Sequence, residues 1–200
     1  IICTNRPVPN GTLGGVRGSD DTYSIMFRIS EEDQKHIVDV SRHLCRTGEL
    51  ARTRDFIQHG HTTVYTHVHH VARIALWLNR KLNLKADRDR VIRSALLHDY
   101  FLYDWHDKSH DHPRPHGFHH PKVAMEAAHR HYELHPREQD AIVSHMFPLT
   151  KPPRHREGWL VTAADKLSTF QELSAWWRRK LRPGKLGHLD SRVRKKGNSR

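Results

Sequence analysis

The feature that most constrains the fold is a run of apolar residues at steps of three and four between positions 64 and 82. Its members are Val64, Val68, Val71, Ala75, Leu78 and Leu82. This spacing places them on one face of an α-helix, whereas a strand would require alternation. At about 100° per residue, His67 falls near the edge of that face and His69 points almost opposite to it. Of the three histidines at 67, 69 and 70, we therefore expect only His67 to be directed along the edge of the core.

Further helices are predicted on both sides of this one. Ser30 precedes three acidic residues, so its hydroxyl can cap a helix whose first-turn carboxylates favour the positive end of the helix dipole, and this helix should reach about Leu50. Other helices are expected at about 87–100, 121–134 and 158–180, with a short one beginning at Pro136. Pro121 suits a first turn, where its missing N–H is not needed. Residues 102–119 should form a long loop, and no strand pattern is convincing, so the predicted fold is all-α.

Composition divides the chain into three parts. Residues 1–29 are rich in Gly, Pro, Asn and Thr without a sustained period, which predicts an irregular segment. Residues 30–180 hold the predicted helices and should form one helical domain. Residues 181–200 form a basic tail that is expected to be flexible. Of the net charge of +12, the positions from Arg178 to Arg200 carry +9, through ten Lys or Arg and one acidic residue. The tail could therefore bind nucleic acid or an acidic partner.

The remaining composition limits the setting of the protein. Its two cysteines, Cys3 and Cys45, form neither a disulfide framework nor a zinc-finger spacing, so a reducing, cytoplasmic location is expected. No apolar run approaches the ~20 residues needed to span a bilayer, and the N-terminus lacks the apolar core of a signal peptide. No membrane partner is therefore expected. The chain begins with Ile1 rather than Met, which suggests a truncated start, and the oligomeric state is left open.

Histidine is unusually abundant, and one histidine stands beside an aspartate in an apolar setting. Eleven of the 20 histidines lie between His98 and His145. Imidazole is the commonest metal ligand, although so many histidines cannot all be ligands. The pair His98-Asp99 closes an apolar helix, where a charged Asp is costly to bury unless it is paired or coordinates a metal. Imidazole with carboxylate ligands suits one or two divalent ions of Fe, Mn, Co or Ni, and the distant cysteines exclude a thiolate site.

Three short motifs carry a family resemblance. His67 lies in YTHVHHVA (65–72), His98 and Asp99 in ALLHD (95–99), and Asp165 in TAADK (162–166). In this order and local context they resemble the HD superfamily of metal-dependent phosphohydrolases, which has a His on a first core helix, an adjacent His-Asp pair and a distant Asp. The resemblance covers about residues 60–172. It implies a helical bundle whose first metal ion is held by His67, His98, Asp99 and Asp165.

Two further segments, HGFHHP (116–121) and HMFPLT (145–150), look like those of bacterial HD hydrolases. In relatives with two metal ions, a His opens the helix after the long loop and another follows about one helix later. His120 matches the first, because Pro121 follows it and the small Ala124 lies four residues on. His145 matches the second. The resemblance therefore implies that Asp99, His120 and His145 hold a second ion, with Asp99 bridging the two because a carboxylate has two oxygens.

A site of this kind implies hydrolysis. A metal ion lowers the pKa of bound water towards about 7, and two ions ~3.5–4 Å apart can share the hydroxide that attacks phosphorus. The resemblance thus implies cleavage of a small phosphoester or nucleotide, with Asp99 at the centre of the catalytic site. Lys166 or a loop histidine such as His116 would neutralise phosphate charge or protonate the leaving group. His116 could also be an alternative ligand to His120 or a simple loop histidine.

Two other functions stay open at this stage. One is a non-catalytic, histidine-rich metal-binding module whose basic tail binds nucleic acid. The other is an HD-type di-iron oxygenase, which cleaves a carbon bond with a similar site. Simpler interpretations also exist for single residues: His67 alone is more often a core histidine, and Asp165 beside Lys166 could be a solvated ion-pair partner. The set as a whole favours the metal-dependent phosphohydrolase.

Overall fold

The structure, a computed structural model, describes residues 25–102 and 116–181, without the side chains of residues 116–118 and 179. Its elements are α2 (Glu31–Thr47), the 3-10 helix η1 (Leu50–Asp55), strands β1 (Ile57–His59) and β2 (Thr62–Thr63), α3 (Val64–Lys81), α4 (Arg88–Leu97), α5 (His116–His131), α6 (Pro136–Ser144) and α7 (Arg156–Lys180). This predominance of helix confirms the all-α prediction. Predictions for most of the N-terminal segment, the loop at 103–115 and nearly all of the basic tail lie outside the described residues.

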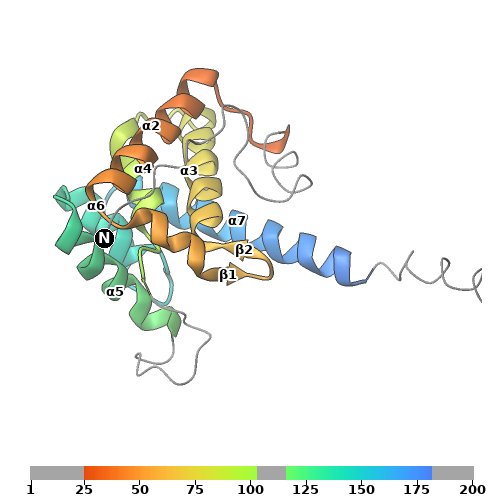
Figure 1. Cartoon of the computed structure of the whole chain (residues 1–200). Coiled ribbons are helices and arrows are strands. Elements are labelled where there is room, and N and C mark those ends of the chain that lie inside the picture. Colours follow the sequence, from red (N-terminus) through yellow and green to blue (C-terminus); the bar gives the residue numbers. More distant parts are fainter. Residues whose placement is uncertain (1–24, 103–115, 182–200) are drawn as a thin grey trace, which may run out of the picture.

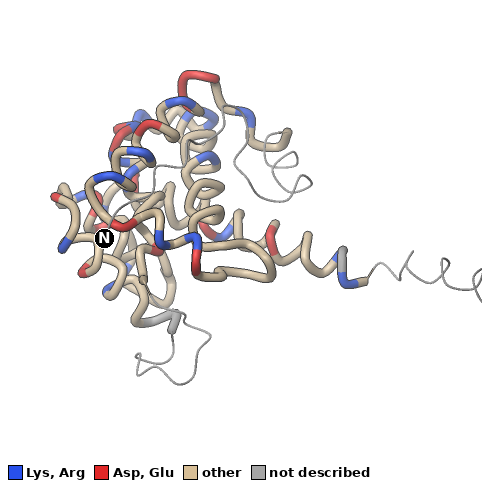
Figure 2. The backbone as a smooth tube through the Cα atoms, viewed as in Figure 1, with Lys and Arg blue, Asp and Glu red and all other residues tan. Residues whose placement is uncertain are grey.

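Side-chain caps explain where several helices begin. The Ser30 hydroxyl accepts a hydrogen bond from the N–H of the third residue after it at 3.1 Å, as predicted for the start of α2. Thr63 caps α3 in the same way at 3.2 Å, and Asp87 caps α4 at 3.0 Å. Each cap satisfies a backbone N–H that has no partner within its helix. Figure 2 shows the acidic first turn of α2 followed by basic residues later in the helix, the order that the helix dipole favours.

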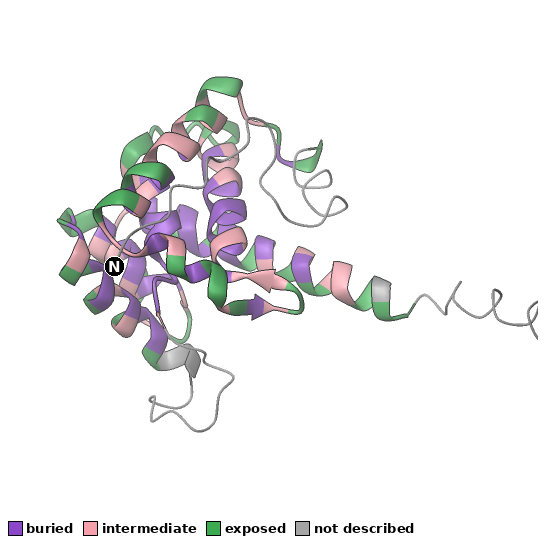
Figure 3. Ribbon diagram, viewed as in Figure 1, coloured by how far each residue is buried: buried purple, intermediate pink, exposed green. Residues whose placement is uncertain are grey.

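Helix α3 is central to the fold and makes its most extensive contacts with α7 and α4. In Figure 1, α2 covers one side of α3 and α4, while α5 and α6 lie together on the side where α7 begins. The C-terminal turns of α7 extend beyond the other described helices. Figure 3 shows buried residues concentrated on α3, α4 and the facing turns of α6 and α7. The core is therefore built chiefly from these four helices.

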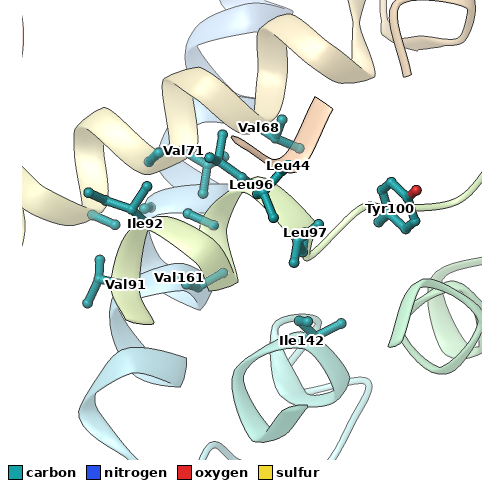
Figure 4. Packing of buried hydrophobic residues seen from close by; sticks show 14 of the residues in the cluster. Leu44, Val68, Val71, Val91, Ile92, Leu96, Leu97, Tyr100, Ile142 and Val161 are labelled. Atoms are coloured by element: carbon teal, nitrogen blue, oxygen red, sulfur yellow. The ribbon is translucent and has the colours of Figure 1, made fainter. Parts of the chain in front are cut away.

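The apolar face predicted for α3 is largely buried. Val64, Val68 and Val71 are fully buried and pack with residues of α4, α6 and α7, several of which are labelled in Figure 4. Leu82, the last residue of the predicted face, is instead 60% exposed because α3 ends one residue earlier, at Lys81. The helical period thus predicted the buried face correctly up to the end of the helix.

We expect the Ile92→Ala substitution on α4 to lower the free energy of unfolding by about 3 kcal/mol. Ile92 is fully buried, so truncation removes apolar contacts and leaves a cavity. The measurement is urea denaturation followed by circular dichroism. Leu82→Ala, at an exposed apolar position, is the control and should change the free energy by less than about 0.5 kcal/mol. Equal stability of the Ile92 variant and the unmodified protein would contradict the described packing.

A small antiparallel sheet is present that the sequence analysis does not predict. Strand β1 pairs with β2, with Ile57 opposite Thr63 and His59 opposite Thr62. Gly60, between the strands, has a φ of 60°, a left-handed conformation that favours glycine. Strands of three and two residues are too short to produce an alternating apolar pattern, so the sequence carries no periodic signal for them.

Helix α5 begins earlier than predicted. It begins at His116 rather than at Pro121, so the expected loop ends sooner and Pro121 lies inside the helix. His120 is likewise within the helix and not at its entrance. The Pro, Gly and His residues between positions 113 and 121 favour a loop by their local conformational preferences. In the added first turn, His120 is buried and lies against Asp99 and His145, contacts between helices that the local sequence does not encode.

Candidate metal centre

The six predicted metal ligands come together inside the fold. They come from α3 (His67), the C-terminal end of α4 (His98 and Asp99), α5 (His120), the end of α6 (His145) and α7 (Asp165). All six are buried, with exposures from 0% to 7%. The structure thus brings together side chains up to 98 positions apart in the chain. Their role as metal ligands stays a prediction.

One part of the cluster surrounds the Oδ2 atom of Asp99. His98 Nε2 lies 3.3 Å from this oxygen and His67 Nε2 lies 3.8 Å from it. The Oδ1 atom of Asp165 is 3.1 Å from His67 Nε2 and 3.8 Å from His98 Nε2. The possible ligand atoms of His67, His98 and Asp165 all lie within 4.8 Å of one another. Two imidazoles and two carboxylates therefore converge at a spacing suited to a divalent transition metal.

The other part surrounds the Oδ1 atom of Asp99. His120 Nε2 lies 3.2 Å from this oxygen and His145 Nε2 lies 3.5 Å from it, while the two imidazole nitrogens are 2.9 Å apart. The two oxygens of one carboxylate therefore face two different sets of imidazoles. This is the arrangement expected of a carboxylate that bridges two ions.

Two of the histidines are oriented by the ends of their own helices. His98 and His145 are the C-cap residues of α4 and α6, and both have right-handed helical backbone angles. The Nδ1–H of His98 donates to the carbonyl of Ala95 at 2.8 Å, and that of His145 donates to the carbonyl of Ile142 at 2.7 Å. With Nδ1 as the donor, Nε2 is the nitrogen that faces Asp99 and would be free to bind a metal ion.

The third histidine, His67, is oriented by a residue that the sequence analysis missed. Both carboxylate oxygens of Glu172 on α7 lie 3.1 Å from His67 Nδ1. Glu172 is buried and also accepts hydrogen bonds from His70 and Ser168. A signal for it exists in the sequence, because Glu172 lies seven residues after Asp165 and so shares its face of α7.

The residues of the centre fit a divalent cation. His98 Nε2 and Asp99 Oδ1 are buried without a hydrogen bond. Imidazole nitrogens and carboxylate oxygens converge there, and burying polar atoms without hydrogen bonds is costly. A cation would satisfy them together, so the chemistry of this donor set matches the metal site implied by the sequence.

The pKa values of the buried side chains are set by burial and by the neighbouring imidazoles and carboxylates. Burial opposes ionisation of Asp165, but the nearby imidazoles of His67 and His98 outweigh it and lower the pKa of Asp165 to about 2. Burial lowers the pKa of His67, but Glu172 and Asp165 outweigh it and raise that pKa well above its ordinary value. Burial lowers the pKa of His145, which favours the neutral, metal-binding form of its ring. A metal ion and a proton would thus compete for these nitrogens.

The small β-hairpin adds two polar residues that the sequence analysis also missed. The side-chain amide of Gln58, buried on β1, donates to Asp99 Oδ2 at 2.6 Å. The ring of His59 meets that of His67 edge-on, with centroids 5.8 Å apart, and its Nε2 lies 3.4 Å from the Thr169 hydroxyl. The hairpin is therefore part of the wall of the centre.

Lys166 and His116 are the residues predicted to neutralise phosphate charge or protonate the leaving group. Lys166 on α7 is exposed, and its ammonium donates to the backbone carbonyl of His145 at 3.3 Å, so it lies at the edge of the centre. His116 is the first residue of α5, but its side chain lies outside what the structure describes. The catalytic roles suggested for both residues stay predictions.

One prediction about the histidines of α3 is wrong. His69 and His70 are buried along with His67, whereas only His67 was expected to face the core. Helix α2 covers the second face of α3, where Ser41 lies 2.9 Å from His69 Nε2. His70 is held by Glu172 from α7. A single apolar face cannot reveal that a helix is covered on several sides.

Fold and site together define the class as a helical domain with a buried cluster of histidine and aspartate side chains. The HD domain family model matches residues 64–169, more than half of the 200-residue chain. The chain therefore belongs to the HD domain family, as its motifs predicted, and members of this family generally are hydrolases and bind divalent metals. Comparisons with curated proteins and with solved structures give no match. In the described ranges, no helix has the length and apolar character to cross a membrane.

Proposed function

We propose that this protein is a metal-dependent phosphohydrolase that cleaves a small phosphoester, including nucleotides as candidate substrates. The observation that carries the proposal is the position of Asp99. Its Oδ2 faces His67 and His98, and its Oδ1 faces His120 and His145. A shared carboxylate between two imidazole sets fits a centre of two divalent ions, the type used to cleave phosphoesters.

The side chains of the centre have separate tasks in this proposal. His67, His98, Asp99 and Asp165 would hold one ion, and Asp99, His120 and His145 would hold the other. When bound, divalent ions make a water molecule nucleophilic at neutral pH and offset phosphate charge. Burial of the ligands excludes bulk water and strengthens these electrostatic interactions.

Two tasks remain: neutralising the negative charge of the substrate and protonating its leaving oxygen. Lys166 is suited to contact phosphate, because the residue is exposed and its ammonium lies beside the backbone carbonyl of His145. Hydrolysis transfers the phosphoryl group to water and returns a proton to the leaving oxygen. A histidine near the entrance, such as His116, is our candidate donor of that proton.

The test is a screen of phosphorylated metabolites, nucleotides and p-nitrophenyl phosphate with protein stripped by a chelator and then reloaded with Mn²⁺, Fe²⁺, Co²⁺ or Ni²⁺. We expect release of phosphate or a phosphomonoester with at least one ion. The rate of the stripped protein should be at least ~10³-fold lower, because the metal supplies several kcal/mol of transition-state stabilisation.

Two outcomes would contradict the proposal. Tight metal binding without turnover of any phosphoester would favour the non-catalytic metal-binding module. Consumption of O₂ by the iron-loaded protein, with cleavage of a carbon bond, would favour the oxygenase.

A further inference from the structure

We propose that Glu172 is the positioning residue of the metal centre, and that it holds His67 in the orientation and tautomer needed to bind the ion. This inference rests on the proposed metal-dependent function. Glu172 lies outside the three motifs that carry the family resemblance and outside the matched residues 64–169. Its role is therefore read from the contacts of this chain alone.

The hydrogen bonds of Glu172 determine which nitrogen of His67 carries the proton. Both oxygens of Glu172 lie 3.1 Å from His67 Nδ1. An ionised carboxylate can only accept hydrogen bonds, so Nδ1 must be the donor and Nε2 is left to face Asp165 and Asp99. Metal-binding histidines commonly donate their second N–H to such a carboxylate, which fixes the ring and increases its basicity as a ligand.

Two other histidines of the centre are oriented without a carboxylate. His98 and His145 stand at helix ends and donate to a backbone carbonyl three residues earlier. Their orientation is therefore supplied by local structure. His67 lies inside α3, and its Nδ1 is satisfied by a side chain from α7, 105 positions away in the sequence.

Glu172 is itself firmly held. It is 7% exposed, and one oxygen also accepts from the Ser168 hydroxyl at 2.9 Å and from His70 Nδ1 at 3.2 Å. Donors from α3 and α7 thus meet at one carboxylate. A carboxylate fixed by several donors can restrain the imidazole of His67 more tightly than a mobile one could.

The experiment compares Mn²⁺ binding to the full chain and to the Glu172→Gln and Glu172→Leu variants by isothermal titration calorimetry. We expect Glu172→Leu to weaken binding roughly 10- to 100-fold and Glu172→Gln to weaken it less, because an amide oxygen can still accept from His67. Long-range ¹H–¹⁵N spectra of the metal-free proteins, recorded at a pH high enough for the His67 ring to be neutral, should show His67 protonated at Nδ1 in the unmodified chain and losing that preference in Glu172→Leu.

Glu138→Gln is the matched control. Glu138 is equally buried but is ion-paired with Arg93 at 2.8 Å, so its loss should lower stability and leave Mn²⁺ affinity within about twofold, the variation expected away from the ligands. If Glu172→Leu fails to fold, the Mn²⁺ affinity and the His67 tautomer of Glu172→Gln decide whether Glu172 positions His67.

The outcomes separate the two claims. Unchanged affinity and tautomer in folded Glu172 variants of a protein that binds metal would overturn this inference alone. An unmodified protein that binds none of Mn²⁺, Fe²⁺, Co²⁺ or Ni²⁺ would overturn the proposed function and this inference with it.

Discussion

Replacement of Asp99 by alanine should abolish phosphoester hydrolysis and remove bound metal from the centre. Asp99 is the residue whose two oxygens face both sets of imidazoles, so its loss affects every ion that the centre holds. The rate should fall at least ~10³-fold, because the several kcal/mol that the metal contributes would be lost. The measurements are metal content per chain by mass spectrometry and turnover of the substrate found in the screen.

Asp87→Ala is a control on the same helix. Asp87 caps the start of α4, whereas Asp99 follows the end of α4. Loss of this cap should lower stability by about 1 kcal/mol and leave metal content unchanged. Circular dichroism of Asp99→Ala should show an intact helical fold. Normal turnover by a folded Asp99→Ala protein would remove Asp99 from the catalytic site.

His120→Ala and His145→Ala should each lower the metal content from about two ions per chain to about one, following the two-metal arrangement. Both imidazoles face Asp99 Oδ1 and lie 2.9 Å from each other, whereas His67 and His98 face Asp99 Oδ2. Removing either therefore disturbs the second set and leaves the first set of side chains in place. Metal content per chain is again the measurement.

His116→Ala should leave the metal content unchanged and provides the comparison within the same histidine-rich segment. Loss of metal in His116→Ala, with full content in His120→Ala, would reverse the assignment of these two residues. A metal content of one ion per chain in the unmodified protein would reject the dinuclear arrangement. That content would instead fit a mononuclear site at His67, His98, Asp99 and Asp165.

The sequence predicted most of the centre because helical periodicity and short motifs are local properties. The period over 64–82 correctly predicted α3 and its buried face, and the ordered motifs around His67, His98-Asp99 and Asp165 correctly predicted the HD family. Each of these signals depends on residues within a few turns of one helix. The side chains that the structure brings together could therefore be named before any contact between helices was known, while their role as metal ligands stays a prediction.

Other features could not be predicted because they depend on which helices cover one another. The burial of His69 follows from the approach of α2, and Gln58 reaches Asp99 only because a hairpin of two very short strands folds beside it. The early start of α5 places His120 within the helix, where it lies against His145 at the end of α6. None of these contacts has a periodic pattern in the chain.

The sequence by itself thus determined the helical class and the family, because local periodicity and short ordered motifs suffice for these, and it named the buried histidines and aspartates that the structure brings together. Tertiary structure alone decided that Asp99 turns one oxygen to each set of imidazoles and that Glu172 holds His67. The physical reason is that hydrogen bonds and electrostatic interactions act over a few ångströms in space. Residues 105 positions apart can be direct partners only after α3 and α7 have packed together.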